Sequence, residues 1–172
     1  MSNAKSDTKR NYLIIWLIFI CVLVGIDQLT KHIFKSILDG KSGIIIIRNV
    51  LELQYVENRG MAFGMLQGRR ILFILLCIIF CAVLIWLFLK LPKTTYFAPL
   101  IITGGIIAGG AVGNFIDRAV RGYVVDFIYF SLIDFPVFNV ADIYVVCGAV
   151  LLVILIIFYY KDDDFSFLKS KR

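Results

Sequence analysis

Four long apolar segments constrain this chain more than any other feature of its sequence. They cover about residues 12–31, 71–91, 97–115 and 139–160, and polar or charged stretches separate them. A helix needs about 20 mostly apolar residues to cross the hydrocarbon core of a bilayer. We therefore predict an all-α membrane protein with four transmembrane helices.

The composition agrees with a single integral membrane domain over residues 1–172. Apolar residues make up 60% of the chain and its mean hydropathy is +0.90, whereas soluble domains are about 45–50% apolar. Soluble, disordered and collagen-like classes are excluded by this excess. The net charge is +6, but the basic residues lie at the ends of apolar segments. We expect them to set membrane orientation, with no nucleic-acid partner.

Basic residues are denser on one side of the predicted membrane. An even number of spans places both termini on that side, and residues 1–11, 90–96 and 161–172 hold nine Lys and Arg in 30 positions. Residues 27–70 and 116–143 hold nine in 72. The positive-inside rule then places both termini in the cytoplasm and the two long loops outside. The first segment follows Lys9 and Arg10 like a signal peptide, but no small-residue cleavage site follows it, so we expect a retained helix.

The first outer loop has the pattern of strands. Ile44–Ile47 is a β-branched run, and apolar residues then alternate with polar ones over residues 51–55. This pattern predicts a small extracytoplasmic β-sheet between spans one and two, over about residues 43–66, on the membrane surface. In the third span, Gly105, Gly109 and Gly113 form one small-residue stripe, which predicts close approach of a neighbouring helix.

Cysteines and histidine do not suggest a metal centre. Cys21, Cys77, Cys81 and Cys147 all lie inside apolar segments, and His32 is the only histidine. We interpret the cysteines as packing residues and expect no disulfide, no metal and no organic cofactor.

Five aspartates near the apolar segments need an explanation, because ionisable groups are costly there. Asp27 has Lys31 one helical turn later, and Asp117 has Arg118 beside it. These neighbours keep the two carboxylates ionised, which indicates a structural role.

Asp126 and Asp142 have apolar neighbours and no cation beside them in the sequence. Burial and a second carboxylate both raise a carboxyl pKa, so two such groups can share one proton. One then activates water while the other protonates a carbonyl oxygen, which is the chemistry of an aspartic peptidase. The alternative is that both are hydrogen-bonded carboxylates at helix ends. Asp134 is a third candidate for the chemistry, or a turn residue before Pro136.

Two asparagines accompany these aspartates. Asn139 precedes Asp142 by three residues and is a candidate N-cap of the fourth span. Asn58 lies in a glycine-rich loop, where it is either a turn former or an amide that holds a peptide backbone.

Five short motifs occur in order among the four spans. They are DQLTK at 27–31, ENRGMAFG at 57–64, GNFIDR at 113–118, VDF at 125–127 and FPVFNVAD at 135–142. Through these motifs the chain resembles the lipoprotein signal peptidases of bacteria, also called signal peptidase II.

The resemblance implies a membrane aspartic endopeptidase without a cofactor. It would remove the signal peptide from diacylglyceryl-modified prolipoproteins by cutting before the lipidated cysteine, as a monomer among the lipids of the bacterial cytoplasmic membrane. Asp126 and Asp142 would be the catalytic dyad at the outer face, beneath a cradle formed by the sheet. Asp27 and Lys31 would support the first helix, and Asp117 would help hold Arg118. The residues that would line or shape the substrate site are Asn58, Gly60, Asn114, Arg118 and Asn139.

Two other functions fit parts of the pattern. A small proton-coupled transporter would use membrane aspartates as a relay, although the acidic residues gather at one face. A non-catalytic assembly protein would use the glycine stripe of the third span, but it would have no need of Asp126 and Asp142.

Overall fold

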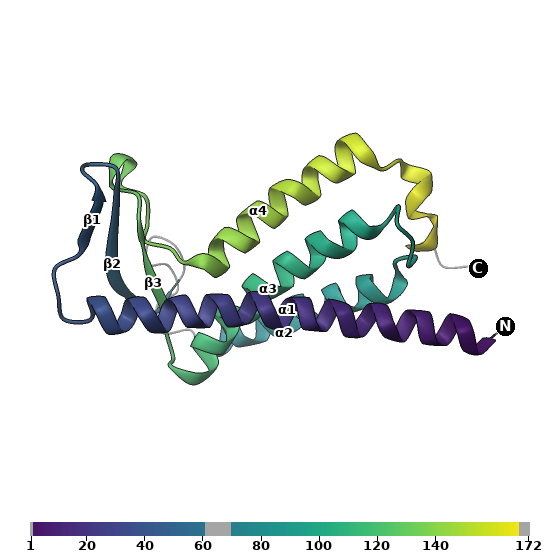
Figure 1. Ribbon diagram of the computed structural model, residues 1–172, viewed down its shortest axis with the longest axis horizontal. Helices are drawn as coiled ribbons and strands as arrows, with labels where there is room; N and C mark the ends of the chain where they lie inside the picture. Colours follow the sequence, from purple (N-terminus) through teal and green to yellow (C-terminus); the bar gives the residue numbers. More distant parts are fainter. Residues whose placement is uncertain (1, 61–69, 169–172) are drawn as a thin grey trace.

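Four long helices and a three-stranded sheet make up the fold in the computed structural model, which describes residues 2–60 and 70–168. The helices are α1 (Ser2–Leu38), α2 (Arg70–Lys90), α3 (Ala98–Val120) and α4 (Val140–Ile154). Each of the first three contains a segment long and apolar enough to cross a membrane, as does α4 together with the helical turn after it, over Val140–Tyr159. The sheet lies at one end of the helices, and both chain termini lie at the other (Figure 1).

The first and third helices extend well beyond the predicted spans, whereas the fourth stays within the predicted 139–160. The first was expected over residues 12–31 but is helical over Ser2–Leu38, and the third continues past residue 115 to Val120. The fourth begins at Val140 and continues beyond Ile154 as a π-helical turn, Leu155–Tyr159. Apolar runs mark only the lipid-facing part of a helix. Hydrogen bonding continues where polar side chains such as Asp27 and Lys31 are buried against other elements.

The sheet is antiparallel, in the order β1 (Ile44–Ile47), β2 (Leu51–Asn58), β3 (Val124–Tyr129). The two strands expected in the first outer loop are present. The prediction placed the whole sheet between spans one and two. It was incomplete, because the third strand, β3, follows α3 and pairs with β2. Such long-range pairing is not visible in a local sequence pattern. Residues 61–66 of the predicted cradle lie outside the described residues.

One face of the sheet packs on the end of α1. Val125 and Phe127 of β3 are buried with Leu38 of α1, and Phe127 stacks on Phe34 at 4.4 Å between ring centroids. Successive side chains of a strand point to opposite faces. Asp126, between those two apolar residues, therefore points away from this core and toward Asn139, the residue before α4.

Helix α3 is the centre of the bundle and packs against α1, α2 and α4. A Cβ added at Gly105 or Gly109 would lie 2.8 Å from Phe19 or 2.9 Å from Leu23, both on α1. At Gly113 it would lie 2.5 Å from the Asp27 carboxylate. The prediction of a close helix approach along this stripe is confirmed, and the neighbour is α1.

Candidate active site

Asp126 and Asp142 reach the same place from different elements. Asp126 lies in β3 opposite Val56 of β2 and is 1% exposed. Asp142 is the third residue of α4, whose N-cap is Asn139. Asn139 Oδ1 accepts from the Asp142 backbone N–H at 3.0 Å, and Asp142 Oδ2 accepts from the Asn139 backbone N–H at 3.1 Å. This capping box confirms the predicted helix start.

The Asn139 side chain links the two aspartates. Its Nδ2 donates to Asp126 Oδ1 at 2.6 Å, while its Oδ1 is engaged with the Asp142 backbone. The alternative prediction, a hydrogen-bonded carboxylate at a helix end, is correct for the position of Asp142 and wrong for that of Asp126, which is a strand residue.

Asn114 of α3 connects the dyad to a buried cation. Its Nδ2 donates to Asp142 Oδ1 at 2.8 Å, and its Oδ1 accepts from Lys31 Nζ at 2.9 Å and from Asn139 Nδ2 at 3.2 Å. An ammonium group only donates. The Asn114 oxygen must therefore face Lys31, and its amide N–H groups must face Asp142.

Asn58 holds the other side of Asp126 from the end of β2. Its Nδ2 donates to Asp126 Oδ2 at 2.9 Å, and its Oδ1 accepts from the Gly60 backbone N–H at 3.0 Å. Arg118 of α3 donates to the Gly60 carbonyl at 3.3 Å and lies over the Phe73 ring at 4.9 Å. These contacts bring Asn58, Gly60 and Arg118 to the same end of the bundle as the dyad.

Lys31 is fully buried among carboxylates. Its Nζ lies 2.9 Å from Asp27 Oδ2, which is the ion pair expected from the i,i+4 spacing, and 3.1 Å from Asp117 Oδ2. Asp27 also accepts from the Ala141 backbone N–H at 3.0 Å, and Asp117 from that of Val125 at 3.1 Å. The charge cluster thus joins α1 and α3 to the start of α4 and to β3.

Burial and charge give Asp126 an unusual pKa. Its pKa is raised from 3.8 to about 7, chiefly because burial disfavours the charged form and further because of the negative charge of Asp142. Hydrogen bonds from Asn58 and Asn139 oppose the shift without cancelling it. Near neutral pH this carboxyl is therefore protonated in part of the molecules and can donate its proton, as a general acid must.

Comparison with known proteins identifies the family. The profile described as "Signal peptidase (SPase) II" matches residues 19–158. The chain belongs to the signal peptidase II family. This family consists of aspartic peptidases, and the chain is accordingly an enzyme of that class.

Individual relatives agree with this placement. The chain is 43% identical to the lipoprotein signal peptidase of Caldanaerobacter subterraneus over 137 residues, which cover 79% of this chain and 91% of the relative. It is 42% identical to that of Halothermothrix orenii over 135 residues, 78% and 90% of the two chains. A solved structure described as a bacterial membrane enzyme superposes with a TM-score of 0.75 at 31% identity, covering 91% of this chain and 93% of that one.

The structure corrects the expectation for Asp117 and decides between the two interpretations of Asp134. Asp117 does not pair with Arg118; it contacts Lys31 and Arg121. Adjacent residues of a helix point about 100° apart, whereas residues four apart share a face, which explains why Arg121 is the partner. Asp134 is solvent-exposed in a turn, with φ 50°, and accepts from Tyr129 Oη at 2.6 Å. The turn interpretation of Asp134 is therefore correct.

Gln28 is a member of the cluster that sequence reasoning missed. Its Nε2 lies within hydrogen-bonding distance of Asp27 Oδ2, the Gly113 carbonyl and Asp117 Oδ1, at 3.1–3.2 Å. Arg121 was also missed, although its i,i+4 spacing from Asp117 was a usable signal. For Gln28 the only signal was its place in the motif at 27–31, because two of its three partners are 85 and 89 residues away.

Removing the buried cation should destabilise the fold. Lys31→Met leaves Asp27 without its cation, and an uncompensated buried charge costs about 3–5 kcal/mol. We expect a large fall in Tm in detergent, and a partial recovery in Lys31→Met/Asp27→Asn, which removes the stranded charge. Lys41→Met, at an exposed lysine, is the control and should unfold like the parent. If Lys31→Met matched the parent, or the second substitution brought no recovery, the cluster would not hold the fold together.

Proposed function

We propose that this chain removes the signal peptide from diacylglyceryl-modified prolipoproteins by cutting the peptide bond before the lipidated cysteine. The observation that carries the proposal is the pair of carboxylates from β3 and α4, joined through Asn139, in a member of the signal peptidase II family. The relatives described above are named lipoprotein signal peptidases.

The two aspartates take different parts in the reaction. Both oxygens of Asp142 accept from N–H groups, and the residue lies in the first turn of α4, where the helix dipole favours a negative charge. Asp142 is the base that takes a proton from water. Asp126, with its raised pKa, gives its proton to the carbonyl oxygen of the scissile bond.

The proton transfers balance over one turnover. The water oxygen bonds to the carbonyl carbon as Asp126 protonates the carbonyl oxygen, which forms a tetrahedral diol. Asp142 then gives its acquired proton to the leaving nitrogen as the C–N bond breaks, and Asp126 recovers a proton from a diol hydroxyl. The enzyme returns to its starting state without any other reactant.

The surrounding polar residues hold this arrangement and shape the substrate site. Asn58 and Asn139 hold the two oxygens of Asp126, and Asn114 holds Asp142. Arg118 donates a hydrogen bond to the Gly60 carbonyl and so positions that backbone beside them. Asp27, Lys31 and Asp117 support this set through Asn114 and the backbone contacts at Ala141 and Val125.

We place the four helices across the bacterial cytoplasmic membrane, with the dyad at the outer face and both termini in the cytoplasm. In support, the sheet and the termini lie at opposite ends of the bundle (Figure 1), and basic residues are denser near the termini. Both aspartates and their partners come from one chain, so the proposed active form is a monomer. The sheet then lies on the outer membrane surface, where water reaches the scissile bond without entering the bilayer core.

Neutralising either aspartate should abolish cleavage. Asp126→Asn and Asp142→Asn each remove a proton-transferring group, and we expect rates on a diacylglyceryl-modified precursor to fall by a factor on the order of 10³ or more. Asp134→Asn, at the exposed turn aspartate, is the control and should cleave normally. All three variants should keep their Tm within a few degrees in detergent. Substantial cleavage by a well-folded Asp126 or Asp142 variant would refute the dyad.

The reaction should depend on pH through Asp126. Because its pKa is raised to about 7, the protonated acid is present below that pH and is lost as the pH rises through it. We expect kcat/KM to fall tenfold per pH unit well above this value, as for one essential proton. The measurement is kcat/KM on a diacylglyceryl-modified precursor in detergent, with Tm followed in parallel to exclude unfolding. A rate that stays constant up to about pH 9 would contradict Asp126 as the acid.

A further inference from the structure

The chain leaves the sheet directly after the asparagine that holds Asp126. The ladder between β2 and β3 ends at the Asn58–Val124 pair, and Asn58 Nδ2 donates to Asp126 Oδ2 at 2.9 Å. The Oδ1 atom of the same amide accepts from the Gly60 backbone N–H at 3.0 Å. Because a backbone N–H only donates, this contact decides that the amide nitrogen of Asn58 faces the aspartate. The orientation of Asn58 therefore depends on where the backbone of Gly60 lies.

Arg59 joins Asn58 to Gly60, and its side chain is held by the other face of β2. Successive side chains of a strand point to opposite faces, so Glu57 points away from the face that Asn58 shares with Asp126. Arg59 Nη2 donates to Glu57 Oε2 at 2.7 Å. This hydrogen bond lowers the pKa of Glu57, which keeps its carboxylate charged. The end of the strand is thus tied down on the side opposite to the dyad.

The aromatic ring of Tyr123 supports the Arg59 guanidinium from a second element. Tyr123 lies in the turn between α3 and β3, and Arg59 Cζ lies over its ring, 5.3 Å from the centre. A cation within about 6 Å of the centre of an aromatic ring is attracted to the ring face. Arg59 therefore connects the end of β2 to the turn that leads into β3, the strand of Asp126.

Helix α1 holds Tyr123 in the same network. Lys35 Nζ donates to Tyr123 Oη at 2.7 Å and lies over the rings of Tyr123 and Tyr55, at 5.3 and 5.5 Å from their centres. Tyr55 Oη donates to Glu57 Oε1 at 3.1 Å, which closes the network. We call these five residues the rim cluster: Lys35, Tyr55, Glu57, Arg59 and Tyr123. The cluster joins α1, the end of β2 and the start of β3.

We propose that Arg59 is a positioning residue of the peptidase, which holds the backbone after β2 so that Asn58 keeps its hydrogen bond to Asp126. This inference rests on the proposed function. Arg118 holds the Gly60 carbonyl from the side of the dyad, and Arg59 holds the same short segment from the rim cluster. The Arg59 side chain is 63% exposed, so it acts on the reaction through Asn58 and is not a catalytic residue.

The test replaces Arg59 and follows cleavage of a diacylglyceryl-modified precursor in detergent. Arg59→Leu loses both contacts, each of which is weak at an exposed site. We expect kcat to fall about fivefold, with KM and Tm close to those of the parent. Arg59→Lys keeps a cation for Glu57 and Tyr123 and should recover most of the loss. Arg48→Leu, at an exposed arginine in the turn between β1 and β2, is the matched control and should cleave like the parent.

The pH profile separates this role from a general loss of structure. The hydrogen bond from Asn58 opposes the raised pKa of Asp126, so a loosened Asn58 should raise that pKa further. The protonated acid then persists to higher pH, and the fall of kcat/KM at high pH should move upward in Arg59→Leu and return in Arg59→Lys. An arginine that only stabilised the fold would lower the Tm and leave this part of the profile in place.

A double variant shows whether Arg59 acts through Asn58. Asn58→Ala removes the hydrogen bond to Asp126, so adding Arg59→Leu to it should lower kcat no further. An unchanged kcat and pH profile in folded Arg59→Leu would overturn the proposal, as would an equal loss in the presence and absence of the Asn58 side chain. If the folded parent does not cut the modified precursor, the proposed function is refuted and this inference with it.

Discussion

The fully buried ammonium group of Lys31 ties together the elements that carry the active site. It contacts Asp27 on its own helix, Asp117 and Asn114 on α3, and through these residues the backbone of β3 and the start of α4. Burying three charges together is costly unless each is paired and hydrogen-bonded, so the elements are held in one arrangement. Because lysine only donates hydrogen bonds, that arrangement also decides which way the Asn114 amide faces Asp142. The charge cluster therefore fixes both the fold at this end of the bundle and the hydrogen bond that orients Asp142, one carboxylate of the proposed dyad.

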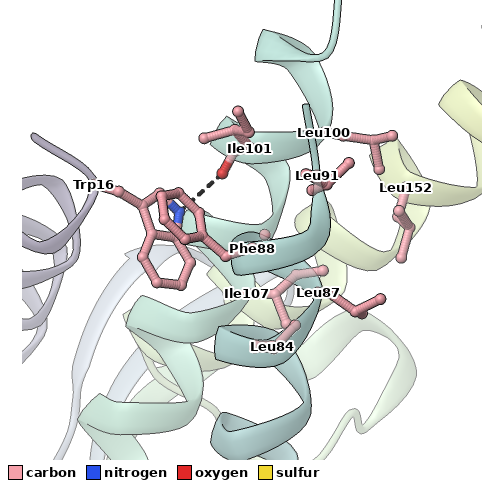
Figure 2. A pocket seen from close by; sticks show the side chains of 10 residues that line it. Trp16, Leu84, Leu87, Phe88, Leu91, Leu100, Ile101, Ile107 and Leu152 are labelled. Carbon is pink, nitrogen blue, oxygen red and sulfur yellow. Dashed lines mark hydrogen bonds between the residues drawn. The ribbon is translucent and has the colours of Figure 1, made fainter. Parts of the chain in front are cut away.

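Helix α3 packs against three other helices, α1, α2 and α4, with three different faces. Its glycine stripe admits α1 so closely that Gly113 leaves no room for a side chain beside Asp27. A second face packs against α4 at Gly110, where an added Cβ would lie 2.4 Å from the Ala141 carbonyl. A third face packs against α2, where Cys77 Sγ donates to the Ala111 carbonyl at 3.3 Å. Nearer the termini, residues of all four helices line an apolar cavity of about 70 Å³ (Figure 2). Contacts on three faces thus hold α3, from which Asn114 and Arg118 extend toward the proposed dyad.

Local sequence patterns were sufficient for contacts within one helix and insufficient for contacts between elements. The Asp27–Lys31 pair and the Asn139–Asp142 capping box follow from spacings of four and three residues, and both are present. The partner of Asp117 was assigned to the adjacent Arg118, although helix geometry favours Arg121. The pairing of β3 with β2, which sets the position of Asp126, joins segments about 70 residues apart. No local pattern contains that information, and the pairing of Asp126 with Asp142 was therefore expected only from the resemblance to a known family.

The most direct measurement is the mass of the products made from one prolipoprotein with and without its diacylglyceryl group, in detergent micelles with the purified protein. We expect the modified precursor to yield two fragments, the signal peptide and a chain that begins with the lipidated cysteine, while the unmodified precursor stays intact. Equal cleavage of both forms, cleavage at another bond, or no cleavage by the folded protein would contradict it.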